Sequence, residues 1–90
     1  MTLQTFTTKK FDREVEVARK RRKDMSKIGD IIKKLALEEP LDRKHRNHKL
    51  KRNYQGRWEC HIEPDWLLVY CKTNTEIIFE RTGSHSDLFK

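Results

Sequence analysis

The chain has 90 residues, of which 34% are hydrophobic and 39% charged, and its formal net charge is +7 at pH 7. This length suits one small domain, which buries only about 60% of the surface of its unfolded chain. No apolar run approaches the roughly 20 residues of a membrane span, and the N-terminus lacks the apolar core of a secretory signal. The two cysteines match neither a metal-binding spacing nor a disulfide framework. We therefore expect one cytoplasmic domain over residues 1–90, with reduced thiols and no membrane contact.

The first forty residues predict one strand and two helices. Residues 3–7 alternate apolar and polar side chains, as a half-buried strand does. Thr7 or Thr8 can cap a helix over residues 9–23. A second helix, capped by Asp24 or Ser26, carries a stripe of isoleucine and leucine and should end just before Pro40. The short join predicts an antiparallel helical hairpin that serves as a scaffold.

The second half of the chain has the two-residue period of β-strands. Residues 58–63, 67–71 and 76–82 predict three strands, and Pro64 and Asp65 suit the corners of the first turn. The predicted fold class is α+β, with the helical hairpin packed on one side of a twisted antiparallel sheet.

A two-residue turn at Pro64 and Asp65 predicts which side chains of the first two of these strands share a face. The inward face then holds Trp58, Cys60, Ile62, Leu67, Val69 and Cys71. The open face holds Glu59, His61, Glu63, Trp66, Leu68 and Tyr70. We expect His61 and Trp66 to be accessible to a ligand, although a shift of one residue reverses this assignment along a strand.

Most of the excess positive charge precedes these strands. Residues 41–57 hold seven lysines and arginines against one acidic residue, whereas residues 58–90 are net negative. The run from residue 43 to 52 is either a solvated loop or a strip that contacts phosphates without reading their sequence. The candidate contacts in this run are Arg46, Lys49, Lys51 and Arg52.

The histidines suggest chemistry on RNA. His48, His61 and His85 each lie where the chain enters or leaves a predicted strand, whereas His45 lies within the basic run. Histidine suits proton transfer near neutral pH, and RNA carries its own nucleophile, the 2′-hydroxyl. A base, an acid and cations for the phosphate are then sufficient, without a metal ion or another cofactor. A single histidine is more often structural, and Asp65 is as easily explained as a turn residue.

Three ordered segments resemble the YafQ branch of the RelE-type toxins. They are His48-Lys49-Leu50, the run from His61 to Tyr70, and the run from Phe79 to Phe89, with Gly56 between the first two. The resemblance extends from about residue 40 to the C-terminus. It implies a RelE-like fold and a bacterial type II toxin that cleaves messenger RNA, usually in the ribosomal A site. It also implies a cognate protein antitoxin and, with it, a possible heterotetramer.

The resemblance also implies roles for single residues. By position in the motifs, the functional residues fall on His48, His61, Asp65, His85 and Phe89. We expect His85 to be the general acid, and His48 or His61, with Asp65, to act on the 2′-hydroxyl. Arg81 would steady the phosphate, and Trp66 and Phe89 would pack on nucleotides. The family commonly has proline after the first histidine, where this chain has Lys49, so the loop and the codon preference are open.

Three other functions fit parts of the sequence. A ParE-like gyrase inhibitor shares the fold class without using the histidines. A non-catalytic RNA-binding module explains the charge but not the histidines near strand ends. A zinc hydrolase built on the three histidines and Asp65 is chemically possible, but no helical His-x-x-x-His frame holds the ligands.

Overall fold

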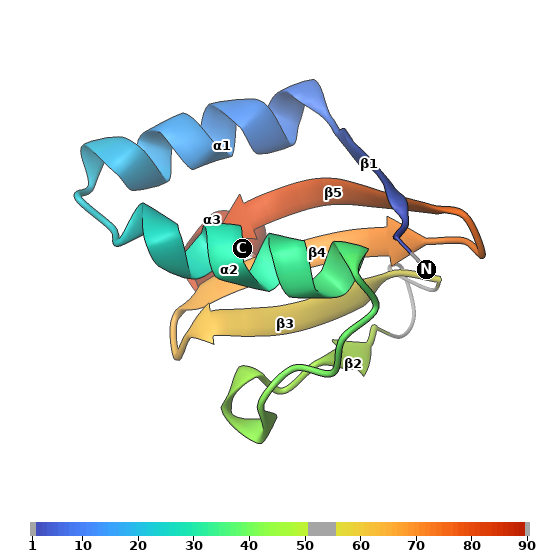
Figure 1. The fold of residues 1–90 in the computed structure, drawn as a ribbon. Helices are drawn as coiled ribbons and strands as arrows, with labels where there is room; N and C mark the ends of the chain where they lie inside the picture. Colours follow the sequence, from blue (N-terminus) through green and yellow to red (C-terminus); the bar gives the residue numbers. More distant parts are fainter. Residues whose placement is uncertain (1, 51–55, 90) are drawn as a thin grey trace.

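Five strands form a single sheet, and two helices cross one of its faces (Figure 1). The structure is a computed structural model that describes residues 2–50 and 56–89. In chain order the elements are β1 (Gln4–Thr7), α1 (Lys9–Lys20), α2 (Met25–Ala36), the 3-10 turn η1 (Arg43–His45), β2 (His48–Lys49), β3 (Trp58–Glu63), β4 (Trp66–Lys72), β5 (Glu76–Gly83) and α3 (His85–Leu88). The strand order is β1-β5-β4-β3-β2, so β4 lies at the centre of the sheet.

The predicted helical hairpin is present. The Thr8 hydroxyl caps α1 by accepting a backbone hydrogen bond of 3.0 Å, and Asp24 caps α2 in the same way. Both helices end a few residues before the predicted positions. Arg22 and Glu38, just beyond the two ends, have φ angles of 61° and 58°, and such left-handed residues stop a helix.

The predicted α+β class is confirmed, but the sheet is mixed rather than wholly antiparallel. β1 runs parallel to β5, with Gln4 opposite Glu76 and Thr7 opposite Phe79, while the other neighbouring strands are antiparallel. A tight turn forces consecutive strands to run antiparallel. Since the helical hairpin and three other strands separate β1 from β5 along the chain, no such turn sets their direction.

A β-bulge in β3 reverses the two faces of β4 relative to the prediction. Glu63 lies opposite Trp66 as predicted, but the register shifts between His61 and Glu63, so that His61 pairs with Leu67. A bulge leaves one residue without a direct partner and moves the rest of the strand by one position. The prediction for β3 is correct, because Cys60 and Ile62 face the helices. The prediction for β4 is wrong: its inward residues are Trp66, Leu68 and Tyr70.

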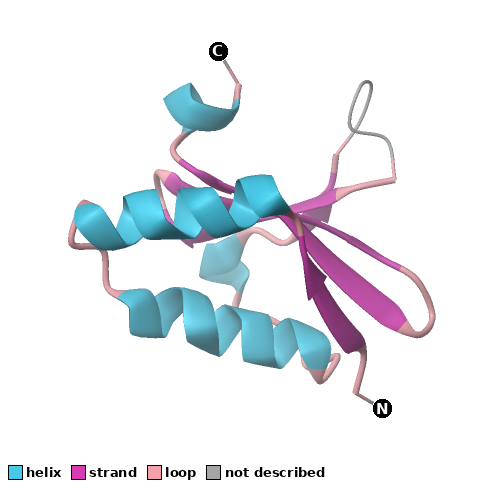
Figure 2. Ribbon diagram, turned by 90° about the horizontal axis from the view of Figure 1, so that it is seen from above, coloured by secondary structure: helices cyan, strands magenta, loops and turns pink. Residues whose placement is uncertain are grey.

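The sheet therefore packs on both faces. On one face, residues of α1, α2 and the strands form the main core, which includes Phe11, Ile28, Ile31, Leu35, Trp66, Tyr70 and Phe79. On the other face, Leu88 of α3 packs against Leu67 and Val69. Figure 2 shows α3 on the opposite side of the sheet from the lower of the two long helices. The short elements β2 and α3 were not predicted. No helix in the described part of the chain is long and apolar enough to cross a membrane.

Candidate functional site

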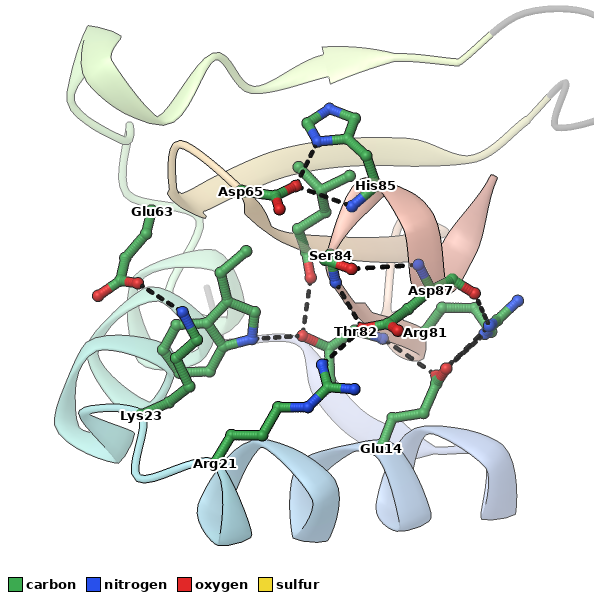
Figure 3. Close-up of polar contacts among 12 residues, drawn as sticks. Glu14, Arg21, Lys23, Glu63, Asp65, Arg81, Thr82, Ser84, His85 and Asp87 are labelled. Carbon is green, nitrogen blue, oxygen red and sulfur yellow. Dashed lines mark hydrogen bonds and ion pairs between the residues drawn. The ribbon is translucent and has the colours of Figure 1, made fainter. Parts of the chain in front are cut away.

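His85 and Asp65 form the best-defined polar pair of the predicted site. His85 is the first residue of α3, and Asp65 lies in the turn between β3 and β4. Asp65 Oδ1 accepts a hydrogen bond of 2.9 Å from the His85 backbone N–H and lies 2.6 Å from His85 Nδ1 (Figure 3). These bonds, the backbone bond first, lower the pKa of Asp65. An ionised carboxylate only accepts hydrogen bonds, so Nδ1 carries a proton and Nε2 is available to a substrate.

His61 lies beside His85. Their ring centroids are 5.7 Å apart and the planes are inclined by 53°. The Nδ1 atom of His61 lies 3.2 Å from the carbonyl oxygen of Pro64, which can only accept, so Nδ1 is the donor. His61 lies on the face opposite the helices, as predicted, but its side chain is only 11% exposed.

Glu59 joins His61 to His48, and sequence reasoning did not single it out as a site residue. Its Oε1 atom lies 3.6 Å from Nε2 of His48 and 3.6 Å from Nε2 of His61. β2 brings His48 there, because His48 pairs with Glu59 across the ladder. Glu59 is only 6% exposed although it is charged, which is uncommon for a carboxylate. Its place two residues before His61 on a strand was the available signal, since such residues share a face.

His45 has a contact that the sequence did not suggest. Its Nδ1 atom lies 2.7 Å from the backbone carbonyl oxygen of His61. His45 therefore ties η1, where the basic run begins, to the strand that carries His61. It holds the backbone of the site rather than its side chains.

Trp66 lies outside the accessible site, which corrects its predicted position on the open face. It is 1% exposed and packs in the main core, where Nε1 donates a 3.0 Å hydrogen bond to the Thr82 hydroxyl. The Thr82 hydroxyl donates in turn to the Leu67 carbonyl oxygen at 2.7 Å. The bulge turns Trp66 inward, so its ring is not positioned to stack on a nucleotide.

Arg81 is held by α1. Its guanidinium donates to both carboxylate oxygens of Glu14, at 2.9 Å through Nε and at 2.8 Å through Nη2. A paired fork of this kind is strong and geometrically specific. Arg81 thus joins β5 to α1, and the predicted phosphate contact competes with this pairing.

The remaining predicted contacts that the structure describes lie on β2 or directly after η1 and α3. Phe89 follows α3 and is 39% exposed, and Arg46 is exposed at the end of η1. Lys49, on β2, places its ammonium 5.5 Å from the centre of the Trp58 ring. Lys51 and Arg52 lie outside the described residues. The structure therefore brings His48, His61, Asp65 and His85 together through the His85–Asp65 bond, the neighbouring His61 and His85 rings, and Glu59 between His48 and His61.

Solved structures of bacterial toxins have the same fold. The *Escherichia coli* DinJ-YafQ toxin-antitoxin complex contains a chain that matches with a TM-score of 0.93 and 33% identity, and the match covers 100% of both chains. A metal-bound toxin from *Helicobacter pylori* matches with a TM-score of 0.90 and 37% identity, over 97% of this chain and 99% of that one.

The sequence comparisons agree with the structural ones. The mRNA interferase toxin YafQ of *Escherichia coli* strain B / BL21-DE3 is 39% identical over 80 residues, which cover 88% of this chain and 87% of the relative. The model of the family described as the bacterial toxin of type II toxin-antitoxin system, YafQ, matches residues 3–90. The chain belongs to this family.

The *Helicobacter pylori* toxin raises the question of a metal ion. Within residues 2–50 and 56–89, no three His, Cys, Asp or Glu side chains are arranged to hold one. The His85–Asp65 and His48–Glu59–His61 contacts are polar pairs rather than a shared coordination sphere.

Proposed function

We propose that the chain is a toxin that cleaves messenger RNA by acid–base catalysis in the ribosomal A site and thereby stops translation. The observation that carries the proposal is the His85–Asp65 pair, which lies next to the ring of His61. A histidine that is paired with a positioned carboxylate is suited to proton transfer near neutral pH. The *Escherichia coli* relative is named an mRNA interferase, which supports the choice of substrate.

The reaction needs only groups that this chain and the RNA supply. A base removes the 2′-hydroxyl proton, and the oxygen attacks the adjacent phosphorus while the bond to the 5′-oxygen breaks. His85, protonated on Nε2, donates that proton to the leaving 5′-oxygen. The products are a 2′,3′-cyclic phosphate and a 5′-hydroxyl end. Asp65, bonded at Nδ1, stabilises the imidazolium before this transfer.

We assign the proton transfers to two groups of residues. Since Asp65 is bound to His85, it belongs with the acid, so the 2′-hydroxyl falls to His61 or His48, the two histidines that share Glu59. Arg46, Lys49 and the neighbouring basic side chains, with Lys51 and Arg52, would hold the phosphates. Phe89 is the exposed aromatic side chain next to His85 that can pack on a base.

A protein antitoxin, encoded beside the gene, would neutralise this toxin in the bacterial cytoplasm. The *Escherichia coli* relative was crystallised in a toxin-antitoxin complex with DinJ. The +7 charge suits an acidic partner, and a heterotetramer of two toxins and two antitoxins is the expected assembly.

The test is the purified chain incubated with programmed ribosomes, with and without an excess of a chelator that binds zinc and copper but leaves the Mg²⁺ of the ribosome in place. We expect cleavage within the A-site codon, with 2′,3′-cyclic phosphate and 5′-hydroxyl ends, and no effect of the chelator. Loss of cleavage in chelator would indicate a metal-dependent hydrolase instead. In cells that express the chain, translation that continues while DNA replication stops would indicate a gyrase inhibitor.

A further inference from the structure

The short helix α3, which begins with His85, depends on the rest of the protein for its position. It has only four residues, and an isolated helix of that length is not stable in water. Leu88 packs it on the sheet, and Asp65 binds its first residue. A capping box closes its first turn: Ser84 N–H donates to Asp87 Oδ2 at 2.9 Å, and Asp87 N–H donates to Ser84 Oγ at 3.1 Å.

Helix α1 contacts this segment from the side away from His85. Figure 3 shows Glu14, on α1, and Arg21, the residue directly after α1, extending toward the end of β5 and toward α3. The two residues are seven positions apart, so they lie on the same face of the helix. Glu14 accepts from Arg81 and from the Thr82 N–H, the latter at 3.2 Å. Arg21 Nη1 donates to Asp87 Oδ2 at 2.8 Å.

Asp87 connects these contacts. Its Oδ2 atom accepts from both the Ser84 N–H and Arg21, so the ion pair and the helix cap share one oxygen. These bonds, with Arg21 first, hold the pKa of Asp87 well below its usual range. A Cβ atom on Gly83 would lie only 2.9 Å from Asp87 Cβ, so the chain folds back closely here. A displacement of Asp87 would therefore move the turn from which His85 extends.

We propose that Arg21, acting through Asp87, is a positioning residue that holds α3 where His85 meets Asp65 and the RNA. Glu14 supports the same segment through β5. This inference rests on the proposed function, because it concerns the placement of the proposed general acid. It assigns α1, otherwise a scaffold, a part in the geometry of cleavage.

Arg21 could also act by binding RNA directly, and the test must distinguish that role from the positioning of α3. Its side chain is 52% exposed, and an exposed arginine can also bind RNA phosphate. A phosphate contact raises KM and adds to the salt dependence of binding. A positioning contact lowers kcat and leaves KM and the salt dependence unchanged, because displacing a catalytic group impairs the chemical step.

The test compares Arg21→Gln, Arg21→Lys, Asp87→Asn and the double variant Arg21→Gln/Asp87→Asn with the wild-type chain. Arg19→Gln is the matched control, since Arg19 is an exposed arginine of α1 that pairs with Glu16 within the helix. The readouts are cleavage kinetics and the NMR signals of the His85 and Asp65 backbone amides. Asp87→Asn removes the same ion pair from the other side and carries the test if Arg21→Gln does not fold.

We expect Arg21→Gln to lower kcat about fivefold, the upper range for an exposed ion pair, with KM unchanged within twofold. Arg21→Lys should recover most of this loss, because a single N–H contact to Asp87 suffices. The double variant should be no worse than either single variant, because both remove one interaction. The His85 amide signal should move in Arg21→Gln and stay in place in Arg19→Gln.

Three results would overturn the proposal: an unchanged kcat and His85 signal in Arg21→Gln, a raised KM with a weaker salt dependence, or losses that add in the double variant. The NMR readout does not depend on activity. If the wild-type chain cleaves no RNA, the proposed function fails, while the displacement of His85 still reports on the positioning contact.

Discussion

On the side of the sheet that faces α1 and α2, the buried side chains are mostly apolar and come from both halves of the chain. On the other side, Leu67, Val69 and Leu88 form a small apolar cluster, and Glu59, His61 and His85 lie near it. Asp65 and Trp66 show the contrast best, because they are adjacent in sequence. Asp65 is exposed and binds His85, whereas Trp66 is buried and binds Thr82. One face supplies stability, and the other holds polar groups in positions suited to chemistry.

The largest effect that tests this contrast is on stability. Trp66→Ala should lower the free energy of unfolding by about 3–5 kcal/mol, since it empties a core site and leaves the Thr82 hydroxyl without its donor. Thermal and urea unfolding measure the change. Phe89→Ala, which truncates an aromatic residue that is 39% exposed, is the comparison and should lower the free energy of unfolding by less than half as much. Equal losses in the two variants would remove the distinction between the faces.

A smaller effect should fall on activity. Glu59→Gln keeps the shape of the side chain but removes the charge that lies between His48 and His61. We expect about a tenfold loss of cleavage, less than the 10²–10⁴-fold of a direct proton donor or acceptor. Glu76→Gln, at the start of β5 and away from the histidines, should retain full activity. A fully active Glu59→Gln variant would exclude Glu59 from the site.

Acidification should weaken the contacts that hold α3. Because the pKa of Asp87 is lower in the folded protein than in the unfolded chain, its contribution to stability is present above about pH 4 and lost as the pH falls through the folded value. Melting temperatures measured between pH 7 and pH 3 should fall less steeply in Asp87→Asn than in the wild type. Parallel curves would show that the Arg21–Asp87 pair adds no stability.

The smallest expected effect is a difference between the rates at which the two thiols are chemically labelled. Burial raises the pKa of Cys60 to about 12, so it holds almost no reactive thiolate at pH 8. Cys71 is only partly buried. Iodoacetamide at pH 8, followed by mass spectrometry, should label Cys71 first and leave Cys60 unmodified in the native protein. Equal labelling rates would show that the helix-facing side opens readily.

Local signals in the sequence predicted the elements well. The helix caps, the apolar stripe of α2 and the alternation of β3 act between near neighbours, and the structure places these elements close to where they were predicted. The turn at Pro64 and Asp65 was also predicted correctly. The bulge between His61 and Glu63 was not predicted, because nothing in this part of the sequence distinguishes a regular ladder from a shifted one. This shift in register decided whether the Trp66 side chain faced the core or the solvent.

The residues of the site were predicted less completely than the helices and strands. Motif order pointed to His48, His61, Asp65 and His85, which the fold brings together. Glu59 and the Arg21–Asp87 pair were missed, because their roles depend on contacts between residues far apart in sequence. Arg21 and Asp87 are separated by 66 positions, and no periodic pattern links them.

The central claim is that His85 donates the proton to the leaving 5′-oxygen. His85→Ala, assayed on programmed ribosomes beside the wild-type chain, tests it most directly. We expect at least about a hundredfold loss of cleavage, with a melting temperature close to that of the wild type because the side chain is exposed. A His85→Ala variant that cleaves messenger RNA at the wild-type rate would contradict it.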